Sequence, residues 1–148
     1  MKGFYWNSRG LLDLAKYRYI LEAIRDHNFD IVAVMETRKQ DMSRANLNRL
    51  SGGADFVWRC LQPRGRSGGI LLGVNSLILD LSLIVEGEFF IKFHLRNRQD
   101  DFKWILMAVY GPAQKDFKSA FLSELVRTCQ QNTLPTLIRG DFNIMRHG

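Results

Sequence analysis

The sequence predicts one α/β domain whose middle part is largely antiparallel. Two segments with helical spacing of apolar residues, one near each end of the chain, alternate with short apolar runs of strand length. Between them, from Phe56 to Tyr110, several strand-like runs are separated by short turns. With 148 residues, 46% of them hydrophobic and 24% charged, the chain is large enough for the core of one globular domain.

The chain opens with a β-α-β pattern. A strand is expected from Met1 to Trp6, followed by a helix that begins after Asp13 and stops at His27-Asn28. The apolar face of this helix is predicted to carry Leu14, Tyr17, Leu21 and Ile24. The continuous run from Ile31 to Met35 is typical of a strand covered on both faces, and it ends in Glu36-Thr37-Arg38.

The middle of the chain is expected to begin with a short helix from Ser43 to Leu50, which Ser51-Gly52-Gly53 breaks. The strands that follow are predicted over Phe56–Cys60, Ile70–Val74, Leu77–Val85, Phe89–Leu95 and Trp104–Tyr110. Phe89 and every second residue after it are expected to face the core. The other face of that strand, with Phe90, Lys92, His94 and Arg96, is expected to be partly wet.

The end of the chain carries a small polar cluster directly after a strand. A second helix striped by Phe117, Phe121, Leu122 and Leu125 precedes it. The apolar pair Leu137-Ile138 then leads to Gly140, Asp141 and Asn143. Small polar residues at this end of a strand are typical of ligand sites in α/β sheets. A turn in which Asn143 adopts an unusual backbone angle explains the cluster equally well.

Net charge, apolar runs and cysteine spacing indicate which partners and which cellular compartment to expect. A net charge of +6 with an isoelectric point near 9.6 favours a polyanionic partner. No apolar run reaches the roughly 18 residues of a membrane span, and the first residues do not resemble a signal peptide, so we expect an intracellular protein with no membrane contact. Cys60 and Cys129 are isolated and are expected to be buried small side chains.

Four predicted strands end in polar residues of the kind that hydrolytic sites use. Asn7 follows the first strand, Glu36 the second, Tyr110-Gly111-Pro112 a later one, and Asp141 with Asn143 the last. If these ends converge at one edge, a carboxylate with water and substrate oxygens suits Mg²⁺. Such an ion can polarise a phosphoryl oxygen.

These residues also carry a resemblance to a known family. The motifs, in chain order, are Trp6-Asn7-x-Arg9-Gly10, Met35-Glu36-Thr37-Arg38, Ser67-Gly68-Gly69, Val109-Tyr110-Gly111-Pro112 and Gly140-Asp141-Phe142-Asn143. Together they resemble the endonuclease/exonuclease/phosphatase superfamily, and most closely the apurinic-type endonuclease domain of plant LINE-type (non-LTR) retrotransposons. The resemblance runs over residues 1–148 and covers only the N-terminal part of the family domain. It implies a DNase I-like layered α/β sandwich of mixed sheets flanked by helices, truncated at the C-terminus.

The resemblance implies roles for individual residues. Glu36 is similar to the carboxylate that binds the metal, Mg²⁺ or Mn²⁺, and Asn7 to the asparagine that helps position metal and phosphate. Tyr110 resembles the tyrosine that contacts the phosphate, and Asp141 and Asn143 resemble the pair that activates water and stabilises the phosphoryl oxygens.

The basic loop and its neighbours are candidates for substrate binding. Arg38, Arg64 and Arg66 could contact a nucleic-acid backbone, although a solvated basic face explains each of them at least as well. Ser67, with the two glycines after it, could let the backbone approach another backbone segment or the substrate, whereas a turn that opens the strand at Ile70 explains the segment equally well.

The departures from the family pattern bear on activity. The family domain continues to a further aspartate and a Ser-Asp-His segment that contributes the catalytic histidine, and His27, His94 and His147 do not match it. One hypothesis is therefore the N-terminal part of a Mg²⁺-dependent DNA endonuclease, nuclear if functional and inactive or nearly so alone. The alternatives are a catalytically silent relic with weak nucleic-acid affinity, and a phosphatase, against which the basic charge argues. With half of a sandwich, we also expect one sheet to lack its partner, to expose an apolar face and to make the chain poorly soluble.

Overall fold

The computed structural model describes residues 1–9, 14–38, 47, 55–62, 68–112 and 114–141. In chain order the elements are β1 (Gly3–Asn7), α1 (Leu14–His27), β2 (Ile31–Met35), β3 (Phe56–Leu61), β4 (Ile70–Asn75), β5 (Leu79–Glu86), β6 (Phe90–Asn97), β7 (Lys103–Tyr110), the 3-10 helix η1 (Lys115–Phe117), α3 (Lys118–Gln131) and β8 (Thr136–Asp141). The predicted helix from Ser43 to Leu50 lies outside the described residues, apart from Leu47. Within the described part, no helix has the length and apolar character needed to cross a membrane.

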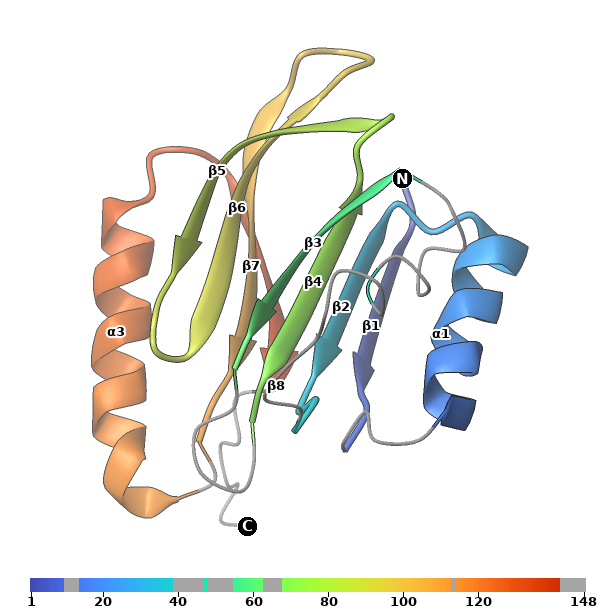
Figure 1. Ribbon diagram of the computed structural model, residues 1–148. Coiled ribbons are helices and arrows are strands. Elements are labelled where there is room, and N and C mark those ends of the chain that lie inside the picture. The colour runs from blue at the N-terminus through green and yellow to red at the C-terminus, as the bar shows by residue number, and fades with distance from the viewer. Residues whose placement is uncertain (10–13, 39–46, 48–54, 63–67, 113, 142–148) are drawn as a thin grey trace, which may run out of the picture.

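The strands form two four-stranded sheets that face each other (Figure 1). The first sheet has the order β1-β2-β4-β3 and the second the order β5-β6-β7-β8. The pairs β1-β2 and β7-β8 are parallel, whereas every other neighbouring pair is antiparallel. Both sheets are therefore mixed, which confirms the predicted sandwich of mixed sheets flanked by helices.

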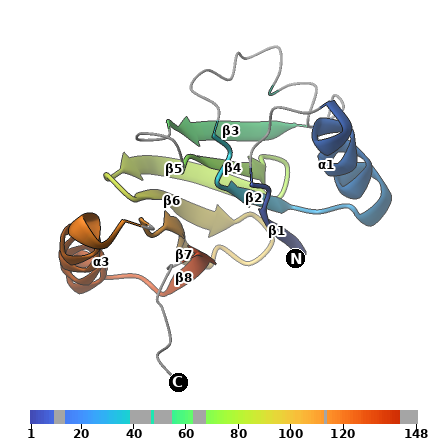
Figure 2. The same cartoon turned by 90° about the horizontal axis from the view of Figure 1, so that it is seen from below.

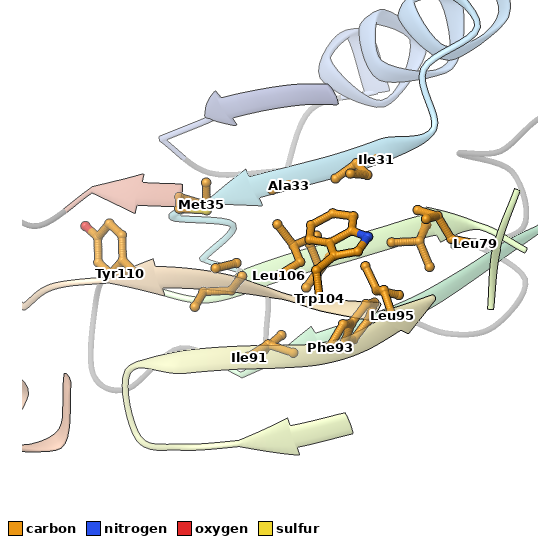
Figure 3. Close-up of a cluster of buried hydrophobic side chains, with 14 residues drawn as sticks. Ile31, Ala33, Met35, Leu79, Ile91, Phe93, Leu95, Trp104, Leu106 and Tyr110 are labelled. Carbon is orange, nitrogen blue, oxygen red and sulfur yellow. The ribbon is translucent and has the colours of Figure 1, made fainter. Parts of the chain in front are cut away.

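The main core lies between the two sheets. On β2 the alternate residues Ile31, Ala33 and Met35 face this core, and on β7 the same alternation brings Leu106 and Tyr110 into it (Figure 3). The expectation that one sheet would lack its partner is wrong. The chain contributes four strands to each sheet, so the inner faces of both sheets cover each other.

Helices α1 and α3 cover the outer faces of the two sheets (Figure 2). Helix α1 packs Ile20 and Ile24 against the first sheet, and α3 packs Phe121 against the second. The helical face predicted for α1 omitted Ile20, which is fully buried, because Leu21 is apolar too and lies only one position away. Phe90, expected on a partly wet face, is buried because α3 covers it.

Two smaller predictions about polar and thiol groups also differ from the structure. Lys92 is buried on the face covered by α3, where its ammonium donates to Asn132 Oδ1 at 2.9 Å. Cys60 is half-buried and Cys129 is exposed, so the prediction of two buried thiols is wrong for Cys129. The reason is that Cys129 lies on the solvent face of α3, one position beyond the buried Thr128.

Candidate active site

The C-terminal ends of β1, β2, β7 and β8 lie at the same edge of the sandwich (Figure 1). Asn7 is the last residue of β1 and stands in register with Met35, directly before Glu36. Tyr110 is the last residue of β7 and stands in register with Asp141 on β8. Parallel pairing brings these ends to one edge in each sheet, and face-to-face packing brings the two edges together.

Glu36 is the buried acidic group at this edge. Its side chain is 11% exposed, and its carboxylate Oε1 forms an ion pair with Nη2 of Arg38, whose side chain is 41% exposed. Both residues have a left-handed backbone, with φ of 55° and 54°. Such angles cost a non-glycine residue about 1–3 kcal/mol, so the surrounding contacts must impose them.

Hydrogen bonds from both neighbouring strands hold the Glu36 segment. From the β1 side, the Ser8 amide donates to the Met35 carbonyl at 3.1 Å, and the Ser8 hydroxyl lies 3.3 Å from the carbonyls of Met35 and Glu36. The Lys16 ammonium in turn donates to the Ser8 carbonyl at 2.6 Å. Lys16 and Ser8 were not singled out from the sequence, because Ser8 occupies the variable position of its motif and Lys16 belongs to a helix.

The glycine pair holds the other side of the segment. The amides of Thr37 and Arg38 donate to the carbonyls of Gly69 and Gly68 at 3.3 and 2.9 Å. Both glycines are buried and have φ of 93° to 99°, which favours glycine. Of the two explanations left open for this motif, the structure therefore supports the close approach of backbone to backbone, and the partner is the segment that carries Glu36.

The oxygen atoms near Glu36 suit a hard divalent ion. The end of β1, which pairs with β2, carries the Asn7 side-chain oxygen, which accepts from the Arg9 amide at 3.2 Å. The fully buried Thr37 hydroxyl has no hydrogen-bond partner among the described residues. Those residues contain no group of three His, Cys, Asp or Glu that could hold a metal. A divalent ion at Glu36 would therefore complete its shell with water and substrate oxygens, as Mg²⁺ commonly does.

The remaining predicted site residues divide into two groups. Tyr110 is buried, and its amide donates to the Phe89 carbonyl at 3.0 Å. Asp141 is placed by its backbone pairing with Tyr110. The predicted site residues Asn143, Arg64, Arg66 and Ser67 lie outside the described residues.

A basic side chain that sequence reasoning did not single out joins the two sheets near this edge. The Arg139 guanidinium carbon on β8 lies 4.9 Å from the centroid of the Tyr5 ring on β1. Burial raises the pKa of the Tyr5 phenol, whereas the charge and hydrogen bond of Arg139 oppose that rise. The interaction links β8 to β1, and no local sequence pattern could have predicted it because it joins residues at opposite ends of the chain.

The fold is similar to several solved structures of low sequence identity. The mannosyl-6-phosphatase of Bacteroides thetaiotaomicron superposes with a TM-score of 0.67 at 15% identity, over 97% of this chain and 66% of that one. TDP2 of D. rerio, complexed with a single-stranded DNA product, has a TM-score of 0.69 at 15% identity, and the match covers 97% of this chain and 61% of TDP2. The human Nocturnin catalytic domain has a TM-score of 0.64 at 15% identity, and the match covers 94% of this chain and 62% of the Nocturnin chain.

The chain thus spans a little under two thirds of the length of these three structures. A comparison with curated protein sequences finds no match. The sequence itself matches the endonuclease/exonuclease/phosphatase family from residue 4 to residue 147, which is nearly its whole length. This match and the two facing sheets show that the chain belongs to the endonuclease/exonuclease/phosphatase family.

Proposed function

We propose that the chain supplies one side of the active site of a divalent-metal-dependent DNA endonuclease of the LINE retrotransposon type. The reaction is hydrolysis of a phosphodiester bond. The site residues are the predicted ones, with Glu36 at the metal, Asn7 and Tyr110 at the phosphate, and Asp141 and Asn143 at the attacking water. Arg38, Arg64, Arg66 and Ser67 are the proposed contacts to DNA.

The observation that carries this proposal is the constrained segment around Glu36. Its carboxylate is withdrawn from solvent, backbone contacts on two sides fix its position, and its neighbour Arg38 is both paired to it and partly exposed. A buried carboxylate on a residue with a strained backbone is more typical of a functional site than of a residue that only stabilises the fold. The net charge of +6 supports a polyanionic substrate.

The side chains act on substrate through position and charge. Glu36 holds the cation, which supplies electrostatic stabilisation of the phosphoryl and leaving oxygens when it is bound. Arg38, which pairs with the same carboxylate and is partly exposed, would donate to a phosphate oxygen of the substrate. Asp141 accepts the proton of the attacking water, and Tyr110 and Asn7 orient the phosphate.

The phosphatase alternative shares this metal and phosphate chemistry and differs in the substrate. The similarity to a mannosyl-6-phosphatase concerns the fold alone. The excess of basic residues favours an extended polyanion over a small phosphomonoester, because each neutralised phosphate adds to binding through counterion release.

Two forms of the protein test the proposal. The 148-residue chain is expected to bind Mn²⁺, followed by paramagnetic relaxation of water protons, while nicking supercoiled plasmid weakly or not at all. The chain together with the residues that follow it in its reading frame is expected to nick plasmid with Mg²⁺ and to be silent with EDTA. This expectation rests on the proposal that the further catalytic aspartate and histidine lie in the part of the family domain beyond this chain.

Glu36→Gln is the decisive variant. It should abolish Mn²⁺ binding and lower nicking by the longer protein at least about 100-fold, because several kcal/mol of transition-state stabilisation depend on the ion. Glu22→Gln, at an exposed carboxylate on α1, is the matched control and should change neither measurement. Hydrolysis of p-nitrophenyl phosphate without plasmid nicking would favour the phosphatase. Absence of Mn²⁺ binding and of both activities would favour the silent relic.

A further inference from the structure

A cavity of about 230 Å³ lies beside the candidate active site, between the ends of the two sheets. From the first sheet it is bounded by the end of β3 and the start of β4. From the second it is bounded by the turn between β5 and β6 and by the end of β7. The 3-10 helix η1 contributes Phe117. Of the described residues with a proposed catalytic role, Tyr110 lines this cavity, and that role concerns the phosphate rather than a ligand inside the cavity.

The cavity shares residues with the corner that holds Glu36. Tyr110 lines it, and so do Gly68 and Gly69, whose carbonyls accept the amides of Arg38 and Thr37. A molecule in the cavity would therefore touch the backbone that positions Glu36. The cavity is thus placed to hold a group that neighbours the reacting phosphate.

The walls of the cavity suit a flat ring. Leu61 and Ile70 provide aliphatic surface, and Phe89, Tyr110 and Phe117 provide aromatic surface. The Phe89 ring is held by an edge-on contact with Phe121, with ring centroids 5.6 Å apart and an interplanar angle of 79°. Phe117 is 50% exposed, so part of its ring is accessible to a ligand in the cavity. Stacking of a base on such aromatic side chains contributes about 1–3 kcal/mol.

The polar groups of the cavity favour a neutral, hydrogen-bonding ring as the ligand, in preference to an anion. Gln62 and Gln114 add side-chain amides, each with donors and an acceptor. The lining residues that the structure describes include no Lys or Arg, so these walls offer a phosphate group no cationic partner. The phosphate is favoured outside the cavity, on the side of Arg38.

The size of the cavity sets an upper limit on the ligand. Sites for drug-sized molecules are commonly about 300–1,000 Å³, so about 230 Å³ suits one ring system rather than a whole dinucleotide. We infer that this cavity binds an unpaired nucleobase of the nucleic-acid strand whose phosphate lies at the Glu36 corner. The inference rests on the proposed function and adds a base contact to it, which requires a single-stranded or extruded nucleotide.

Fluorescence of 2-aminopurine tests the inference on the 148-residue chain. A short single-stranded DNA carries 2-aminopurine at one position, and a matched strand has an abasic site there. The strand with the base should bind about tenfold more tightly and its fluorescence should be quenched on binding, since stacking contributes on this scale. Phe117→Ala should remove most of this difference while leaving the affinity for the abasic strand unchanged.

Two controls separate this inference from the proposed function. Leu122→Ala removes an apolar side chain of similar exposure, 48% against 50%, that does not line the cavity, and it should retain the preference for the base. Glu36→Gln should retain that preference although it abolishes nicking by the longer protein. Equal binding of the two strands, no binding of either, or an equal loss in Leu122→Ala and Phe117→Ala would overturn the inference. Plasmid nicking without a preference for the base would leave the proposed function standing.

Discussion

Strands β2 and β7 are alike along their length and differ at their ends. Each is buried on both faces, with alternate side chains in the core between the sheets and the others under a helix. β2 is followed by the left-handed, ion-paired Glu36 and by Thr37, whose hydroxyl has no hydrogen-bond partner in the described part of the chain. β7 ends in Tyr110, which packs into the core, and the buried Gly111-Pro112.

If the proposed site is right, the residues within these two strands stabilise the fold, whereas the residues after β2 serve the chemistry. The bodies of the strands are apolar and close-packed, which stabilises the fold through buried area. The end of β2 keeps a carboxylate, a strained backbone and a buried hydroxyl without a partner among the described residues, all of which oppose stability. The variants below test that division, beginning with the largest expected effect.

Truncation in the body of β7 should cost the most stability. Leu106 is fully buried between the sheets, so Leu106→Ala should lower the free energy of unfolding by about 2–5 kcal/mol through lost apolar contact and a residual cavity. Urea denaturation measures the change. Leu83→Ala, at a 50% exposed position on β5, is the control and should change stability little. Equal losses would contradict the division.

A methyl group at the end of β8 should have the next largest effect. Gly140 has φ of 152°, and a Cβ there would lie 1.8 Å from the Val109 carbonyl oxygen. Gly140→Ala should therefore destabilise the protein by about 2–4 kcal/mol through overpacking and backbone strain. Thermal and urea unfolding give the value. The atoms nearest to a Cβ on Gly3 belong to the movable Tyr5 side chain, so a cost of Gly3→Ala as large as that of Gly140→Ala would count against the clash.

Removal of the buried hydroxyl should act in the opposite direction. Thr37→Val keeps the shape of the side chain and removes an oxygen without a hydrogen-bond partner among the described residues, so it should raise stability by about 1 kcal/mol. If the hydroxyl serves the metal or the substrate, the same variant should weaken Mn²⁺ binding. A loss of stability would mean that the oxygen has a partner outside the described residues.

The smallest expected effect concerns pH. Burial lowers the pKa of His94 below its usual value of 6.5, and the charge of Lys92 lowers it further. The folded state therefore binds fewer protons than the unfolded state, and the contribution of His94 to stability, present above pH 6.5, is lost as the pH falls. Between about pH 7.5 and about pH 5.5 the wild type should lose more stability than His94→Gln. Equal losses would contradict the assignment to His94.

The bodies of the strands could be predicted from the sequence because their pattern is local. The run from Ile31 to Met35 is apolar at every position, which is typical of a strand with two covered faces. The division of strands between the sheets could not be predicted in this way. β4 lies between β2 and β3 in space although β3 precedes it in sequence, and such an order depends on long-range packing.

The sequence motifs predicted individual candidate residues of the site. They did not predict the hydrogen bonds that hold those residues in place. Glu36, Tyr110, Asn7 and Asp141 were identified by motif, and the structure brings their strand ends to one edge. The hydrogen bonds to Gly68 and Gly69 join the Glu36 segment to residues about thirty positions away, and no periodicity reports such a contact. Phe117 was predicted on a helix stripe, but it lies in η1, before the start of α3, and it lines the cavity instead of joining the buried cluster around Phe121.

The link between the Glu36 segment and the glycine pair also bears on the order of folding events. The neighbours β5, β6 and β7 follow one another in sequence, so their pairing closes only short loops. The pairing of β2 with β4 closes a longer stretch of chain, and the bond from the Arg38 amide to the Gly68 carbonyl depends on that pairing. The meander of the second sheet can therefore form early, whereas the Glu36 corner is completed only when distant segments have met.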